Sequence, residues 1–550
     1  MKNVQGVPLP LGTTIQENRI NFSVSIPKGK SCSLLLYQAG ETKVSAEYEM
    51  EKQEGSIWAI ALEGIEPDQY EYNYRVDGQI VVDPYVKTLA GREVWGVENT
   101  AQKHEIRGKL TVPTFEWGED APLKIPQYEV VAYSLHVRGF TKNPYSGVSH
   151  NGTFEGVIEK IPYLLELGVN QIQCMMIYDF EETGKKCNYW GYGDAYYFAP
   201  KNGYSANGDG PKSLKKMIHA CHEAGIEVVL QMAFSDTAPK TMMVDCLRYY
   251  RAEYHVDGFL LNPTVIPMDL ALSDPMLQTT KILYYQTDFQ NDMRRFLKGD
   301  EGMIPGVRFW MRHVPAHSFN FITTHSGFTL YDLVSYNAKH NEENLEKNRD
   351  GIDENFSWNC GEEGETEAEE VKMLRKRQMY NTLFLLLLSE GTPCILAGDE
   401  FANTQMGNNN VYCQDNETGW LNWEKLSEEK DLFEFVKMLI RIRKERITLR
   451  GNVSELKVSF HGEEGWKVQE ERTSRQLGIL YENPNGHSCY IACNMHWLEH
   501  ELAVPNLSEQ REWRMIASTE EGILPVPKKM PRKKTMKMKP RTIVVLTEGV

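Results

Sequence analysis

The sequence lacks any long hydrophobic run, and this limits where the protein can reside. The longest uninterrupted apolar stretch, residues 383–388, is far too short to cross a bilayer, because a transmembrane helix needs about 20 apolar residues. The first residues, MKNVQGVPLPLGTTIQ, contain no apolar core of the kind that a signal peptide requires. We therefore expect a cytoplasmic protein that makes no use of a membrane.

Cysteine is also sparse, with 10 in 550 residues. The one close pair, Cys489 and Cys493, lies in a strand-like segment. A spacing of four places both side chains on one face of a strand, but too far apart to bridge easily. No histidine or cysteine with zinc-type spacing lies nearby. We expect reduced thiols in the core, no bound metal and no organic cofactor.

Basic residues are outnumbered, since 60 Lys and Arg against 76 Asp and Glu give a formal charge of −16. This balance disfavours nucleic acid, whose phosphates would be repelled, and favours a neutral or cationic partner. The one dense basic tract is KKMPRKKTMKMKPR, residues 528–541. We expect it to be a solvated loop between two terminal strands, and binding of a phosphate or polyanion is the alternative.

Both ends of the chain show short segments in which apolar and polar residues alternate. RINFSVSI, SCSLLLYQ, SIWAIALEG and YEYNYRVDG follow one another near the start, with turn residues between them. This pattern predicts an antiparallel β-sandwich over residues 1–122. ELKVSFHG, QLGILYEN, CYIACNM and RTIVVLT repeat it near the end, which predicts a second β-sandwich over residues 449–550.

Strands and helices alternate between these two parts. The apolar strand VVAYSLHV precedes an amphipathic helix, GVIEKIPYLLELG, and the strand NQIQCMMIY precedes a second helix, SLKKMIHACHEAG. Both helices end in glycine, the residue most common at helix C-termini. A third strand, IEVVLQMAF, follows. The alternation predicts a parallel sheet covered on both faces over residues 123–448, either doubly wound or a (β/α)8 barrel.

Long motifs in this middle region carry a family resemblance. They run NFITTHSGFTLYDLVSYNAKHNEEN, NRDGIDENFSWNCGEEG, LRKRQMYNTLFLLLLSEGTPCILAGDEF and TQMGNNNVYCQDNETGWLNW, and VAYSLHVRGFT, NYWGYGDAYYFAP and HVDGF precede them. The chain resembles the isoamylase and glycogen-debranching branch of the α-amylase superfamily over nearly its whole length. The resemblance implies a (β/α)8 TIM barrel that binds α-glucan at its carboxyl rim. It also implies an N-terminal β-sandwich like a carbohydrate-binding module and a C-terminal β-sandwich.

The same resemblance locates three catalytic positions. Family members cleave glucan with a carboxylate nucleophile, a protonated carboxylic acid and a third, stabilising carboxylate. This sequence has Asn262 at the position of the nucleophile, Tyr285 at that of the acid, and Ser326, after His325, at that of the stabiliser. A neutral amide is a poor nucleophile and carries no charge that stabilises a cation. We therefore predict that the family's catalytic positions are degenerate.

The connections that form the rim of the barrel are short as well. Only seven residues separate Phe234 from the helix that begins near Met242, and the chain passes from Asp288 directly into another helix. Rim loops carry the function of a barrel, whereas strands and helices carry its fold. A calcium site of the superfamily's type would need loop ligands that this sequence lacks.

Aromatic and polar residues at other family positions are the candidate carbohydrate contacts, because aromatic faces stack on sugars and amides bond to hydroxyls. The candidates are Tyr189, Trp190, Tyr192, His325, Asn409 and Trp420. A structural role is the alternative for each of them. Trp190 and Tyr192 would then fill the connection after the second strand, and the asparagines 408–410 would stabilise a turn.

Three functions stay open at this point. The first is a non-hydrolytic protein that binds glycogen or a starch-like glucan or maltooligosaccharide, or regulates its metabolism. The second is an active α-1,6-glucosidic hydrolase with relocated carboxylates, for which Asp236 and Asp288 are the candidates because both lie at predicted strand ends. The third is a structural partner that no longer binds sugar and forms a homo-oligomer or docks onto an enzyme of glycogen metabolism.

Overall fold

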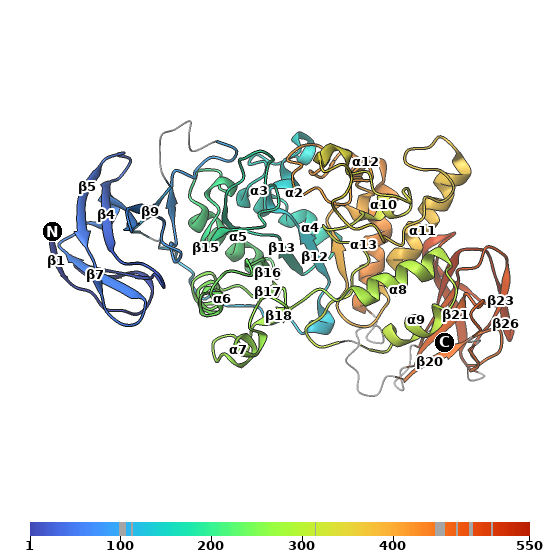
Figure 1. Cartoon of the computed structure of the whole chain (residues 1–550). Coiled ribbons are helices and arrows are strands. Elements are labelled where there is room, and N and C mark those ends of the chain that lie inside the picture. Colours follow the sequence, from blue (N-terminus) through green and yellow to red (C-terminus); the bar gives the residue numbers. More distant parts are fainter. Residues whose placement is uncertain are drawn as a thin grey trace.

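The computed structural model describes residues 1–97, 106–111, 114–313, 315–445, 457–468, 471–482, 488–507 and 510–549. Figure 1 shows three parts in a row, with strands at the N-terminal end, a body of helices and strands in the middle, and more strands at the C-terminal end. Among the described residues, no helix combines the length and the apolar character that a membrane span requires.

Two antiparallel sheets form the N-terminal part. One has the order β1-β7-β3-β2, with β6 beside β7, and the other has the order β10-β11-β8-β4-β5, with β9 beside β8. Apolar side chains of β3, β4, β7 and β8 form one core, as the alternation in the sequence predicts. The strands are β1 (Lys2–Gln5), β2 (Gly12–Gln16), β3 (Arg19–Ser25), β4 (Cys32–Gln38), β5 (Val44–Glu49), β6 (Glu51–Lys52), β7 (Ile57–Glu63), β8 (Tyr70–Val76), β9 (Gln79–Val81), β10 (Leu89–Ala90) and β11 (Arg107–Lys109).

A parallel sheet with the order β18-β17-β16-β13-β12-β19 forms the wall of the central barrel. Its strands are β12 (Ala132–Leu135), β13 (Gln171–Cys174), β16 (Glu227–Met232), β17 (Gly258–Leu261), β18 (Lys281–Leu283) and β19 (Cys394–Leu396). β14 (Tyr178–Phe180) and β15 (Ala195–Pro200) form a separate antiparallel pair in the connection after β13. The strands of the wall are buried on both faces, as expected for a parallel sheet that helices cover.

One extended segment, residues 317–321, closes the ring between β18 and β19. The backbone N–H of Tyr284 donates to the carbonyl of His317 at 3.0 Å, and Asn320 forms a parallel bridge to Pro393. The chain between β18 and this segment forms helices, so the described residues provide six strands and this segment for the ring. The barrel of α-amylase type that the family implies is therefore present, and in the described part of the chain its ring consists of six named strands and this segment.

Helices cover the outside of the barrel, and several begin or end where the sequence predicts. Gly168 closes α4 in a left-handed conformation, with φ at +96°. The predicted helix over residues 156–168 is two helices in the structure, because Pro162 starts a new helix after Lys160. The helices are α2 (Val137–Thr141), α3 (Phe154–Glu159), α4 (Ile161–Leu167), α5 (Gly210–Glu223), α6 (Lys240–Tyr254), α7 (Met268–Ser273), α8 (Thr287–Lys298), α9 (Ile304–Trp310), α10 (Leu330–Leu333), α11 (Glu369–Leu387), α12 (Lys425–Glu428) and α13 (Lys430–Glu445).

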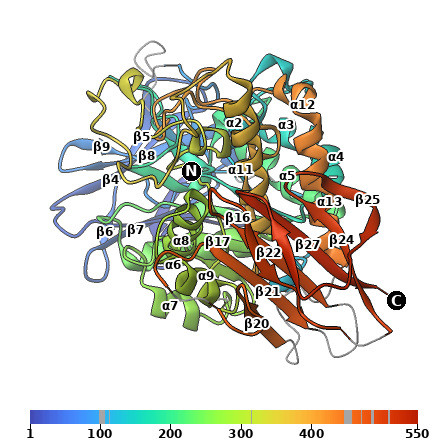
Figure 2. The same cartoon turned by 90° about the vertical axis from the view of Figure 1, so that its right-hand side faces the viewer.

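The C-terminal part is a second β-sandwich, with a sheet in the order β20-β21-β22-β27-β24-β25 and a pair, β23-β26. Helix α11 packs against β27, and Figure 2 shows the sheet beside the barrel helices. The basic tract 528–541 is largely exposed, but it contains β26 and is not one continuous loop. The strands are β20 (Lys457–His461), β21 (Gln476–Glu482), β22 (Cys489–Asn494), β23 (His500–Ala503), β24 (Glu512–Ser518), β25 (Gly522–Lys529), β26 (Thr535–Met538) and β27 (Thr542–Gly549).

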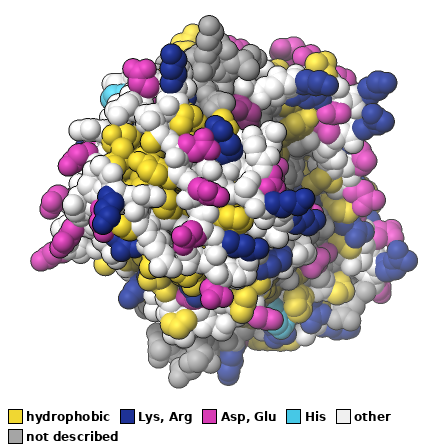
Figure 3. All heavy atoms as spheres, turned by 60° about the vertical axis from the view of Figure 1, so that its left-hand side comes forward, with side chains coloured by type: hydrophobic (Ala, Val, Ile, Leu, Met, Phe, Trp, Pro, Cys, Tyr) yellow, Lys and Arg dark blue, Asp and Glu magenta, His cyan; other side chains and the backbone are white. Residues whose placement is uncertain are grey.

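Charged side chains of both signs are mixed over the surface that Figure 3 shows. No broad area of one sign stands out on that face. Such a surface does not attract a polyanion or a polycation strongly, because neighbouring charges of opposite sign cancel at a distance.

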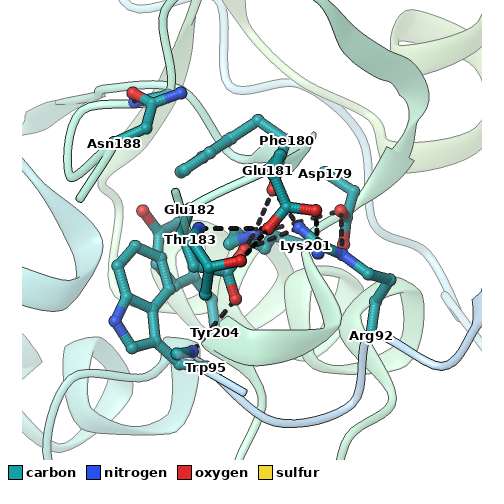
Figure 4. A network of polar contacts seen from close by, with 12 residues as sticks. Arg92, Trp95, Asp179, Phe180, Glu181, Glu182, Thr183, Asn188, Lys201 and Tyr204 are labelled. Atoms are coloured by element: carbon teal, nitrogen blue, oxygen red, sulfur yellow. Dashed lines mark hydrogen bonds and ion pairs between the residues drawn. The ribbon is translucent and has the colours of Figure 1, made fainter. Parts of the chain in front are cut away.

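A buried ionic cluster joins the segment after β10 to the barrel, and Figure 4 shows it from close by. Arg92 donates from Nε to Asp179 at 3.0 Å and from Nη2 to Glu182 at 2.6 Å, and Lys201 Nζ lies 2.9 Å from the same Glu182. These four side chains are at most 4 % exposed. We call Arg92, Asp179, Glu182 and Lys201 the charged corner.

Candidate functional site

A cavity of about 450 Å³ opens where β16, β17 and β18 end. This is the carboxyl end of the barrel strands, where enzymes of this architecture place their active sites. We call it the rim cavity. The residues that line it are Tyr192, Gly193, Gln231, Met232, Ala233, Phe234, Ser235, Asp236, Leu260, Leu261, Asn262, Pro263, Tyr285, His325 and Ser326.

All three residues at the predicted catalytic positions line this cavity. Asn262 directly follows β17 and is exposed, but its side-chain oxygen accepts hydrogen bonds from the N–H and the hydroxyl of Thr264, at 3.0 and 2.8 Å. That oxygen therefore shapes the turn after the strand. Ser326 is exposed at the mouth. Tyr285 packs edge-on against Phe319 and Phe321, and burial raises the pKa of its hydroxyl, so that it stays protonated.

His325 connects two tyrosines of the cavity. Its Nε2 lies 3.1 Å from the Tyr192 hydroxyl, and its Nδ1 lies 3.4 Å from the Tyr285 hydroxyl. Gln231 donates to the same Tyr192 hydroxyl at 3.3 Å. Burial lowers the pKa of His325 to about 4, so the imidazole is neutral at physiological pH. The floor of the cavity is thus a chain of neutral hydrogen-bonding groups.

Tyr192 is the one predicted sugar contact that offers a ring to solvent at this cavity. Its side chain is 44 % exposed, whereas Tyr189 and Trp190 are 1 % and 4 % exposed. The Tyr189 hydroxyl donates to the carbonyl of Gly419 at 2.9 Å, and Trp190 packs edge-on against His325. Tyr189 and Trp190 therefore present no open face to a ligand, and Trp190 supports His325.

The two remaining predicted contacts do not line the rim cavity either. Asn409 is 1 % exposed, and its amide bonds to the side chains of Asn341 and Asn355 at 2.9 and 3.0 Å. Trp420 donates from its indole N–H to Asp415 at 2.8 Å. The structure gives both residues hydrogen-bonding partners within the loops beside the barrel. A sugar contact at either position stays a prediction.

Asp236 is the only carboxylate among the described residues that line the cavity. Asp288, the other candidate for a relocated catalytic group, lies exposed in the first turn of α8 and does not line it. The structure thus does not bring Asp236 and Asp288 together around this cavity. Both cleavage geometries of glycosidases need two carboxyl groups across the scissile bond, at about 5–5.5 Å or 6.5–9.5 Å.

Several lining residues were not among the predicted contacts. Gln231 and Phe234 come from the end of β16 and the residues after it, and Pro263 follows β17. Glutamine, phenylalanine and proline are common in cores and turns, so the residue types themselves do not indicate a site. The one indication in the sequence is that these three residues lie at the ends of predicted strands. Gln231 contributes a polar contact, and Phe234 contributes an apolar wall that is 7 % exposed.

Comparisons with known proteins agree with this architecture. The profile of carbohydrate-binding module 48, the isoamylase N-terminal domain, matches residues 10–86, and that of the α-amylase catalytic domain matches residues 130–262. Isoamylase 1 of rice, a chloroplastic protein, is 30 % identical, with 94 % of this chain and 82 % of that protein covered. The glycogen operon protein GlgX homologue of Haemophilus influenzae is 31 % identical, with 80 % of this chain and 84 % of that protein covered.

Solved structures with the same fold are pullulanases and a glycogen-degrading protein. The type I pullulanase of Bacillus subtilis, solved with maltose, superposes with a TM-score of 0.76 at 17 % identity and covers 98 % of this chain and 85 % of its own. The catalytic module of the pneumococcal virulence factor SpuA, solved with an inhibitor, also gives 0.76, at 18 % identity, with 98 % of both chains covered. With the sequence relatives, these folds show that the chain belongs to the isoamylase and glycogen-debranching branch of the α-amylase family.

Proposed function

We propose that this protein binds α-glucan in the rim cavity without cleaving it, and acts in glycogen or starch metabolism as a binding or regulatory member of its family. The observation that carries the proposal is the side-chain set of the cavity, which holds one carboxylate among its described lining residues. A hydrolase of this family needs a second carboxyl group, because one must be ionised while the other carries the proton.

The cavity has the chemistry that a neutral sugar requires. Tyr192 offers an aromatic face, and Gln231, Asn262, His325 and Ser326 offer neutral donors and acceptors for hydroxyl groups. None of these side chains carries a charge at neutral pH, since the pKa of His325 is lowered to about 4. The names of the relatives support α-glucan as the ligand class.

Hydrolysis by relocated carboxylates is the alternative that the geometry supports least. Asp236 is exposed at the mouth of the cavity, and Asp288 lies outside its lining. An exposed carboxylate works in a high dielectric, so it stabilises a developing cation weakly. A single open carboxylate supplies neither the nucleophile–acid pair nor the dry site that glycoside cleavage needs.

A protein partner on the rim is the second candidate, and exposed apolar side chains favour it. Leu270 and Leu272 on α7 are 54 % and 40 % exposed, and Met276, shortly after the helix, is 49 % exposed. This segment leaves the carboxyl end of β17, beside the cavity, and leads to the start of the parallel strand β18. Such a group of apolar side chains is typical of a docking surface.

Affinity electrophoresis in native gels that contain glycogen or amylopectin tests the proposal. We expect the wild-type protein to be retarded and Tyr192→Ala to be retarded much less. Phe309→Ala is the matched control, because Phe309 is 46 % exposed on α9 and does not line the cavity. Unchanged mobility of the wild-type protein in every glucan would overturn the proposal. A Leu270→Asp change that alters the oligomeric state, without any glucan binding, would favour the protein-partner candidate.

A cytoplasmic location remains part of this proposal. Within the described part of the chain no disulfide joins any cysteine, Cys489 and Cys493 included, which is usual for proteins of reducing compartments. Fractionation of the native source, with this chain followed by antibody, tests the location.

A further inference from the structure

The C-terminal sandwich exposes two tryptophans that play no part in the rim cavity. Trp466 is 60 % exposed and Trp497 is 56 % exposed, whereas Trp513 of the same sandwich is 6 % exposed. Tryptophan carries a large apolar surface, and leaving two of them in water is unfavourable unless something covers them. Trp466 follows β20, and Trp497 lies in the connection between β22 and β23. Figure 1 shows β20 and β23 in the C-terminal part of the molecule.

A series of contacts and one short step along the chain, from His461 to Glu463, connect the two indoles. The Trp466 ring packs on His461 with centroids 4.6 Å apart, and the Trp497 ring stacks on His496 at 4.1 Å. His496 in turn packs on His500, whose Nδ1 lies 3.8 Å from the carboxylate of Glu463, two residues after His461. The two tryptophans therefore belong to one surface. We call Trp466 and Trp497, with the half-buried His496 and His500, the tryptophan surface, and His461 lies buried beneath Trp466.

The backbone at Trp466 has an unfavourable conformation that keeps the side chain exposed. Its φ is +63°, in the left-handed region that bulky residues rarely adopt. The conformation is fixed by a short turn, in which Glu464 bridges to Lys467 and the N–H of Trp466 donates to His461 Nδ1 at 3.0 Å. Strained positions of this kind cluster at ligand-binding segments, where they preorganise a side chain.

We propose that the tryptophan surface is a second α-glucan-binding site, separate from the rim cavity. Its indoles supply exposed apolar surface, and the Glu463 carboxylate, which is 46 % exposed, supplies hydrogen-bond acceptors for hydroxyls. Arg475 lies over the Trp497 ring at 4.8 Å and helps to fix its orientation.

A glucan fits this surface better than a protein partner does. Lys467 and Glu464 beside Trp466 are 69 % and 73 % exposed, so charged groups surround the ring. The core of a protein interface is depleted of such charges, because they would have to be desolvated. A sugar chain leaves them hydrated while it covers the indole. A neutral polymer also suits a chain with a formal charge of −16.

The inference rests on the proposed α-glucan function and adds a second point of attachment to it. Two sites on one molecule bind a branched polymer more tightly than either site alone, because the second contact is intramolecular. Loss of the tryptophan surface should therefore weaken binding to glycogen more than binding to maltotriose, which is too short to reach from the C-terminal sandwich to the rim.

The test compares Trp466→Ala, Trp497→Ala and the double variant with Val526→Ala in glycogen gels. Val526 is the matched control, since it is 78 % exposed in the same sandwich on β25. We expect about tenfold weaker binding for each tryptophan, the effect of losing one well-placed aromatic side chain, and no change for Val526→Ala. Retardation of the double variant equal to that of the wild type would overturn the inference.

The rim variant separates the two proposals. If Tyr192→Ala alone abolishes retardation, the rim proposal stands and the tryptophan surface is not a site. If only the tryptophan variants lose retardation, the inference stands and the rim proposal fails. No retardation of the wild-type protein would overturn both. Oxidation of the wild-type protein by N-bromosuccinimide, followed by peptide mass spectrometry, needs no variant: maltoheptaose should protect Trp466 and Trp497, and their unprotected oxidation would contradict the inference.

Discussion

The charged corner, which joins the segment after β10 to the barrel, and the rim cavity use charge in opposite ways. Asp179 and Glu182 of the corner are buried and neutralised by Arg92 and Lys201. The rim cavity, where an enzyme of this fold would hold its carboxylates, has Asp236 alone among the described lining residues. Acidic side chains are thus plentiful where they join parts of the fold and sparse at the rim cavity. Our proposal is that the protein has the scaffold of its family and uses the rim for binding.

The largest effect that we expect is a loss of stability on substitution in the charged corner. Arg92→Met should lower the free energy of unfolding by about 3–5 kcal/mol, because Asp179 and Glu182 lose a buried partner. Urea unfolding followed by circular dichroism measures it. Arg75→Ala is the control, since Arg75 pairs with Glu47 where both side chains are more than a third exposed. That change should cost about 0–1 kcal/mol. Equal losses for both variants would remove the contrast between corner and surface.

Acidification should lower the stability of the protein through His325 in the rim cavity. Its pKa is about 4 when folded and about 6.5 when unfolded. Below about pH 6.5 His325 is therefore protonated in the unfolded state but stays neutral in the folded state. The free energy of unfolding then decreases as the pH falls toward 4. From pH 7 to pH 5 the protonation of His325 should lower the free energy of unfolding by about 2 kcal/mol. His325→Asn should lose that much less stability than the wild type over this range. An identical pH profile for both proteins would show that the imidazole is not held neutral.

A smaller effect is expected from the aromatic face of the cavity. Tyr192→Ala should weaken binding of maltooligosaccharides about tenfold, whereas Tyr192→Phe keeps the ring and loses only the hydroxyl contacts to His325 and Gln231. Isothermal titration calorimetry with maltoheptaose measures both. Equal affinity of the alanine variant and the wild type would place the ligand elsewhere.

The order of the three parts can be predicted from the sequence, because it depends on local patterns. Alternation with a period of two marks strands such as RINFSVSI, and apolar strands that alternate with helices mark the barrel. The number of strand positions in the ring does not follow from such patterns. It depends on whether the chain between β18 and residue 317 forms helices or another strand, and on the pairing of Asn320 with Pro393.

The rim cavity lies at the ends of barrel strands, and Asn262, Tyr285 and Ser326, which the sequence singles out, all line it; their family roles stay a prediction. The sequence does not show which of the predicted sugar contacts are exposed, because the exposure of a side chain depends on residues far away along the chain. Asn409 is bonded to Asn341 and Asn355, and no local sequence pattern predicts these partners. The charged corner cannot be predicted either, since Arg92 and Asp179 are 87 residues apart.

The smallest effect is expected from Asp236, and it leads to the most direct test of the central claim. Pure protein is incubated with glycogen, pullulan and maltooligosaccharides, and new reducing ends are measured for the wild type and for Asp236→Asn. We predict no release above the blank for either protein. Steady release by the wild type that disappears in Asp236→Asn would contradict the account, because it would show that the one carboxylate of the rim cavity takes part in cleavage.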